Sequence, residues 1–234
     1  MGVQASDLVL VQGMADTRVT LDAWNERPWP VLGRWLAGSL AITGLLLAAV
    51  WIIAVRSTPD ATPFTLPGLH TDPSFGQVAE VLYRNGLVLA LHAMACVAGF
   101  IAGSSLPREA QRYSGILRSI HDRAGPLAIG FVACATGFSL LTQALALGGA
   151  TSTLAAQGAI SPALLLVGLL PHALPELIAL FLPLAAWIVA SRRGEWEQLL
   201  AATVATVLLA VPVLFASAFV EVYASPGVLR ALAG

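Results

Sequence analysis

Long uninterrupted apolar runs constrain this chain more than any other feature. Five runs carry almost no charge, at residues 36–55, 86–103, 126–147, 160–190 and 199–220. A helix of about 20 residues spans roughly 30 Å, the thickness of the hydrocarbon layer of a bilayer. The sequence therefore predicts an all-α fold, a polytopic membrane helix bundle with about five transmembrane helices.

The overall composition agrees with this prediction and excludes some partners. Of 234 residues, 57% are hydrophobic and 11% are charged, whereas about 25% of an average soluble domain is charged. The formal net charge is -1, and the runs of basic residues are short, so nucleic acid is not an expected partner. Cys96 and Cys134 lie inside apolar runs, where we expect neither a structural disulfide nor a cysteine metal site. No cofactor is predicted.

The N-terminal segment differs from the rest of the chain. Residues 1–35 mix short apolar stretches with charged and polar residues and are predicted to be cytoplasmic or interfacial, followed by a single transmembrane domain over residues 36–234. Tryptophans favour the headgroup layer of a membrane, and we expect Trp24, Trp29 and Trp35 to lie there.

The connections between the spans carry their own signals. Asp72 is predicted to cap the second helix, with Pro73 at its first position. The charged connector before residue 126 is predicted to lie on the membrane surface, and the uncharged stretch GGATSTLAAQGA to link the third and fourth spans. Nine of the 12 basic residues, all arginines, fall on the side of the N-terminus. By the positive-inside rule the N-terminus is cytoplasmic and the C-terminus is outside.

The fourth run is longer than one straight crossing needs and contains prolines near its middle. Pro171 and Pro175 each remove a helical hydrogen bond, so this helix is predicted to be kinked or broken. Gly194 follows two arginines and is expected to end it.

Polar residues at membrane depth form the candidate site. An ionisable group at the bilayer centre costs at least about 2.5 to 3.5 kcal/mol, so it needs a partner or water. Under the predicted orientation, several such residues fall in the outer half of the bilayer. The candidate intramembrane polar site comprises His172, Glu176, His92, Glu221, Arg84 and Asn85.

Three interpretations of these polar residues are open. They could bond neighbouring helices around a proline kink, or they could form an ion or proton pathway. They could also bind a metal through His92, His172 and Glu176, with Glu221 as a further ligand, although the spacing matches no known zinc signature. No nucleophile triad, phosphate-binding glycine loop or paired-acid motif is present, so no catalytic residue is predicted and an enzyme is not expected.

A stripe of small residues lies on the second span. Ala95, Gly99 and Gly103 follow one another at steps of four, with His92 on about the same face. Such stripes allow close packing of membrane helices, and packing is the role we predict for these residues.

Two stretches carry a family resemblance. LLPHALPELIALFLPLAAWIVASRR and the terminal LFASAFVEVYASP together resemble the stage II sporulation protein M family of integral membrane proteins. The resemblance covers roughly residues 75 to 228. The matching positions are His172, Glu176, Leu177, Ala218, Phe219, Val220, Glu221, Val222, Ser225 and Pro226.

The resemblance implies a multi-pass protein of the bacterial cell (inner) membrane that serves as a scaffold or subunit of a cell-envelope complex. Its partners would be the lipid bilayer, other membrane or cell-envelope proteins, or further copies of the chain. One alternative is an ion-coupled transporter or channel that uses an intramembrane His/Glu site. A second alternative is a metal-dependent intramembrane hydrolase.

Overall fold

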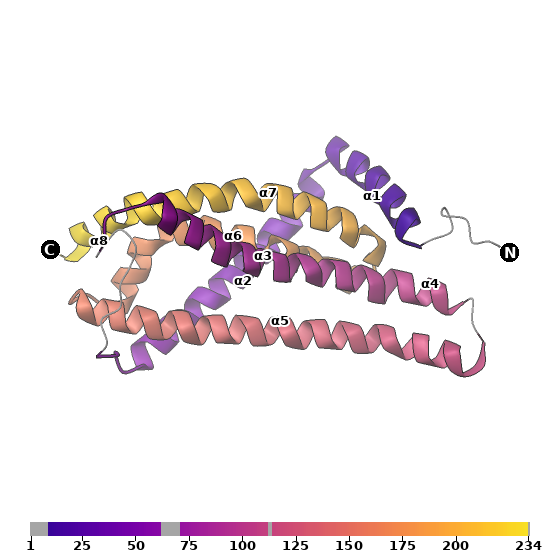
Figure 1. The fold of residues 1–234 in the computed structure, drawn as a ribbon, viewed down its shortest axis with the longest axis horizontal. Helices are drawn as coiled ribbons and strands as arrows, with labels where there is room; N and C mark the ends of the chain where they lie inside the picture. The colour runs from indigo at the N-terminus through magenta and orange to yellow at the C-terminus, as the bar shows by residue number, and fades with distance from the viewer. Residues whose placement is uncertain (1–8, 62–70, 112–113, 234) are drawn as a thin grey trace. The chain divides into compact units, whose positions relative to one another are not determined.

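The structure, a computed structural model, describes residues 9–61, 71–111 and 114–233. All regular structure in these ranges is helical (Figure 1). The α-helices are α1 (Val9–Glu26), α2 (Trp29–Arg56), α3 (Phe75–Phe100), α4 (Leu106–Ala110), α5 (Gly115–Gln157), α6 (Pro162–Arg193), α7 (Leu199–Phe219) and α8 (Ser225–Ala233). Shorter helical turns are η2 (Ile101–Ser105), η3 (Trp196–Gln198) and η4 (Val220–Ala224), of which η2 and η4 are π-helical.

Five helical stretches are long and apolar enough to cross a membrane. Their bounds are Trp29–Arg56, Phe75–Glu109, Arg118–Gln157, Pro162–Arg193 and Trp196–Leu232. Each overlaps one of the predicted spans, so the all-α fold with five helices of membrane length is confirmed. By the length and composition of these helices, the chain is a multi-pass membrane protein.

The start of α3 differs from the prediction at Asp72. The helix begins at Phe75, and its first turn is closed by a reciprocal pair of hydrogen bonds. The backbone N–H of Gln77 donates to Ser74 Oγ over 3.4 Å, and the backbone N–H of Ser74 donates to Gln77 Oε1 over 3.0 Å. This capping box binds two amides that Asp72 alone could not, so the predicted cap at Asp72 and Pro73 is wrong.

Helix α5 replaces two predicted connections. It runs without interruption from Gly115 to Gln157 (Figure 1), so it includes the second half of the charged connector and most of GGATSTLAAQGA. Hydroxyl groups stabilise the C-terminal end of α5. Thr153 Oγ1 donates to the carbonyl of Gly149 over 3.1 Å, and Ser152 Oγ donates to the carbonyl of Ser57 over 3.0 Å. The predicted link is therefore helical.

Helix α6 is continuous from Pro162 to Arg193. The prolines each remove one hydrogen bond, but the backbone on both sides stays helical, so the predicted break does not occur. The helix ends as expected, because Gly194 adopts the left-handed conformation with φ of 69°. The backbone N–H of Glu195 then donates to the carbonyl of Ala190 over 3.0 Å, which satisfies an end carbonyl.

The chain forms two compact units, and each unit takes a segment from all five long helices. Unit 1 comprises Met1–Ser39, Leu89–Gly137 and Phe181–Leu209. Unit 2 comprises Leu40–Val88, Phe138–Leu180 and Ala210–Gly234.

The core of unit 1 contains one of the predicted interfacial tryptophans. Trp35 is buried against Leu182, Ala186 and Ala202, and its ring meets Trp24 edge-on with centroids 5.1 Å apart. Trp29 is exposed, as a headgroup-layer residue would be. Trp35 therefore stabilises the packing of α2 against α6 and α7.

The core of unit 2 includes two apolar clusters. Leu154, Ala155, Leu165 and Leu229 join α5, α6 and α8. Val78, Ala218 and Val222 join the start of α3 to the end of α7 and to η4. These clusters fix the helix ends that carry the polar residues of the candidate site.

Candidate functional site

Unit 2 encloses a cavity of about 650 Å³, a volume within the range of small-molecule sites. We call it the unit 2 cavity. Its lining comes from α2, α3, α5, α6, η4 and α8 and from Thr71, which precedes α3. The polar lining residues are Thr71, Gln77, Glu80, Arg84, Asn85, Thr151, His172, Glu176, Glu221 and Ser225.

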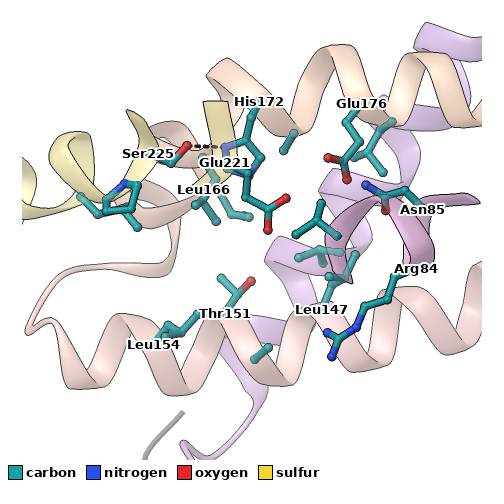
Figure 2. A pocket seen from close by; sticks show the side chains of 18 of the residues that line it. Arg84, Asn85, Leu147, Thr151, Leu154, Leu166, His172, Glu176, Glu221 and Ser225 are labelled. Atoms are coloured by element: carbon teal, nitrogen blue, oxygen red, sulfur yellow. Dashed lines mark hydrogen bonds between the residues drawn. The ribbon is translucent and has the colours of Figure 1, made fainter. Parts of the chain in front are cut away.

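The structure brings together all the predicted polar site residues except His92. His172 and Glu176 are four residues apart on continuous α6, so they lie on one face. Arg84 and Asn85 reach the cavity from α3, and Glu221 reaches it from η4. Figure 2 shows the carboxyl groups of Glu176 and Glu221 and the ring of His172 around one open space.

The carboxyl group of Glu176 interacts with the side chain of Asn85. The two groups do not reach full hydrogen-bond geometry, because Glu176 Oε2 and Asn85 Nδ2 are both buried and complete no hydrogen bond among the described residues. Figure 2 shows the Asn85 amide pointing toward the Glu176 carboxylate. A buried acceptor without a donor is costly, so a proton, water or ligand is expected to bind at Glu176.

Carboxyl groups outnumber basic side chains in the cavity lining. Glu221 lies close enough to Glu176 to disfavour a second negative charge, and Arg84 attracts Glu221. Arg84 also forms an ion pair with Glu80, one turn earlier on α3. The described lining therefore holds one arginine against the carboxyl groups of Glu80, Glu176 and Glu221.

His172 is held by Ser225 at the other end of the cavity. Ser225 Oγ lies 2.7 Å from His172 Nδ1 (Figure 2) and 3.2 Å from the carbonyl of Val220. Ser225 has one hydroxyl proton for these two neighbours. If it donates to Val220, His172 Nδ1 must carry the ring proton; if it donates to His172, Nε2 must carry it. The Ser225 hydroxyl is therefore coupled to the tautomer of His172.

The π-helical turn η4 positions this pair. The backbone N–H of Ser225 donates to the carbonyl of Val220, five residues earlier. Such wide turns occur frequently at functional sites. Glu221 lies in this turn and Ser225 follows it directly, and both line the cavity.

His92 belongs to unit 1 and does not line the cavity. It is fully buried, with its ring 5.4 Å from that of Phe181. His92 is two helical turns, about 10 Å, beyond Asn85 along α3, which explains its separation from the site. Among the described residues, no three His, Cys, Asp or Glu side chains are grouped so that they could hold a metal ion. The interpretation of His92, His172 and Glu176, with or without Glu221, as a metal set therefore gains no support from the described residues.

The small-residue stripe lies against tryptophans of unit 1. A Cβ atom added to Gly99 would lie 2.7 Å from Trp187 Nε1, and one added to Gly103 would overlap the ring of Trp196. Ala95 is buried on the same helix. These glycines make room for bulky side chains, so their role in packing is to receive tryptophans.

Sequence reasoning missed several lining residues as members of the site. Ser225 is four residues from Glu221, and Glu80 is four residues from Arg84, so helical spacing could have found both. Thr151 lies in a stretch predicted to be a link, and no local signal indicates that it reaches a cavity.

Comparisons with known proteins give no match. None of the protein-family models, curated proteins or solved structures that were compared matches this chain. The resemblance to the stage II sporulation protein M family therefore stays a prediction.

Proposed function

We propose that this chain is an ion-coupled transporter or channel that uses the unit 2 cavity, with Glu176 as the coupling carboxylate. The observation that supports this proposal is the convergence of ionisable groups on one cavity. Glu176, Glu221 and Arg84 come from three helical segments far apart in sequence. Functional sites gather ionisable groups in this way.

The state of Glu176 favours transport over helix packing alone. A side chain that only joins helices satisfies its polar atoms with the neighbouring helix. Glu176 Oε2 has no such partner among the described residues, so this oxygen can accept a proton or cation from the cavity. Glu221, close enough to repel it, makes an exchangeable positive charge more favourable.

Flux measurements in proteoliposomes test this proposal. We expect protein-dependent flux of protons, followed with a pH dye inside the vesicles, or of radioactive Na⁺. The flux should fall at least tenfold in Glu176→Gln, because each transport cycle needs the carboxylate of Glu176 to bind the ion. Glu195→Gln is the matched control, since Glu195 pairs with Arg193 and does not line the cavity. Flux that is unchanged in Glu176→Gln would remove Glu176 from this role.

A second proposal is a membrane scaffold or a subunit of a bacterial cell-envelope complex, in the inner membrane. Its support is the sequence resemblance. Five of the residues that carry the resemblance also line the cavity, namely His172, Glu176, Glu221, Ser225 and Pro226. Gentle solubilisation and co-purification test it. Recovery of the protein alone and monomeric in every preparation would contradict it.

The distribution of arginines supports a cytoplasmic N-terminus and an outside C-terminus for either function. A reporter enzyme that is active only outside the cytoplasm, fused after Gly234, tests this orientation. Activity of the fusion is the expected result.

A further inference from the structure

The unit 2 cavity combines an acidic region with an apolar wall. Glu176 and Glu221 face the open space, and leucines of α5 and α6, including Leu147, Leu154 and Leu166, lie around it (Figure 2). A ligand that fills this space would place a polar group and an apolar body in contact with different parts of the lining.

The charges indicate the sign of that polar group. Arg84 pairs with Glu80 and also attracts Glu221, and the described lining holds no second arginine or lysine for Glu176. A buried charge without a counter-charge is unfavourable. A positively charged ligand would supply the counter-charge that the lining lacks.

The volume and the donor set argue against a bare divalent metal ion as the ligand that fills the cavity. Calcium takes six to eight oxygen ligands and magnesium requires near-octahedral geometry, but the described residues contain no group of three acidic, His or Cys side chains that could hold a metal. A volume of about 650 Å³ instead matches an organic molecule.

The type of cation follows from the lining as well. Quaternary ammonium groups are typically bound by aromatic cages, and none of the described lining residues is Phe, Tyr or Trp. Glu176 Oε2 is a buried acceptor that completes no hydrogen bond among the described residues, although the Asn85 amide faces it. An ammonium group that carries N–H can donate to it, which a quaternary ammonium cannot.

We propose that the unit 2 cavity binds an amphipathic organic cation, with its N–H-bearing ammonium group between Glu176 and Glu221 and its apolar body against the leucines of α5 and α6. This inference rests on the proposed function and names the substrate class of the same site.

Binding of 4-phenylbutylamine to the purified full-length protein in lipid nanodiscs, measured by calorimetry, tests the proposal. Saturable binding is expected. Its affinity should exceed that of the neutral 4-phenylbutanol and of the trimethylammonium analogue by about tenfold or more, because only the primary ammonium makes a charge-assisted hydrogen bond to Glu176. This comparison needs no variant. Equal binding of the amine and the alcohol would overturn the proposal.

Variants locate the binding to this cavity. Glu176→Gln should weaken binding of the amine by about tenfold or more, and Leu166→Ala by about fivefold or more through loss of apolar contact. Glu195→Gln should bind like the wild type. An unchanged affinity in a Glu176→Gln protein whose helical circular dichroism matches the wild type contradicts the proposal.

The outcome also separates this inference from the proposed function. Glu176-dependent flux of protons or Na⁺ without any binding of the amine would overturn the substrate class and leave the transporter proposal standing. Absence of both would overturn both.

Discussion

Ser225 Oγ lies 2.7 Å from His172 Nδ1, and both side chains are buried. The contact joins α6 to the first residue of α8 and fixes one end of the unit 2 cavity. The contact also holds the His172 ring in one orientation. The direction of the hydrogen bond at Nδ1 sets which ring nitrogen carries the proton.

Replacing Ser225 with alanine should destabilise the protein. The change leaves His172 Nδ1 without this partner, and we expect a loss of about 0.5 to 2 kcal/mol, the range for a buried interhelical hydrogen bond. Unfolding of the wild type and the variant in a titration with a denaturing detergent measures this loss of stability. Ser191→Ala is the matched control, since Ser191 Oγ is buried without a hydrogen-bond partner among the described residues. Equal losses in the two variants would contradict a specific role for the Ser225 contact.

Alanine at Gly103 should disturb the packing of unit 1. Its Cβ would overlap the ring of Trp196, and overpacking costs about 1 to 3 kcal/mol. Gly130→Ala in α5 is the control, because its Cβ would meet no atom within 4 Å. We expect Gly130→Ala to be neutral or slightly stabilising in thermal unfolding, since alanine favours the helix. If the Gly103→Ala protein were as stable as the Gly130→Ala protein, the Trp196 ring would have moved to make room for the new Cβ atom at no cost. That result would contradict the prediction.

The capping box of α3 gives a test of where this helix begins. Ser74→Ala removes the acceptor for the Gln77 amide and should cost about 1 kcal/mol of stability. Asp72→Ala should change the stability little, because α3 begins at Phe75. Chemical unfolding of both variants measures the difference, and a larger effect at Asp72 would restore the cap predicted from the sequence.

Removing the cavity arginine should change affinity in the opposite direction to removing Glu176. Arg84→Gln leaves Glu80, Glu176 and Glu221 without a lining arginine, so binding of 4-phenylbutylamine should become stronger, by up to about fivefold for an exposed pair. Arg230→Gln is the control, since Arg230 is exposed and does not line the cavity. Weaker binding in Arg84→Gln would indicate that Arg84 contacts the ligand.

The helices could be predicted because each apolar run has only one stable form in lipid. Their ends could not be predicted equally well. Thr151, Ser152 and Thr153 indicated a link by composition, but all three are buried in α5, and Ser152 bonds to the carbonyl of Ser57, 95 residues earlier. A hydrogen-bond partner so far away in the sequence cannot be predicted from the residues around Ser152.

Most of the candidate site was predictable for a similar reason. Ionisable residues at membrane depth must find partners, which indicated Glu176, Glu221 and Arg84. His92 met the same criterion, yet it is buried in unit 1 beside Phe181. Depth along a helix restricts which residues can meet, but the direction in which a helix packs decides which of them do.

The π-helical turn Val220–Ala224 makes the cavity sensitive to insertions and deletions. Removing one residue from this turn would allow a regular α-helix, because a π-helical turn holds one residue more than an α-helical turn. Glu221 and Ser225 would then be three residues apart instead of four, and their side chains would meet the cavity at a different spacing. Homologous sequences that differ in length at this point, even with both residues retained, would therefore present a cavity of different geometry.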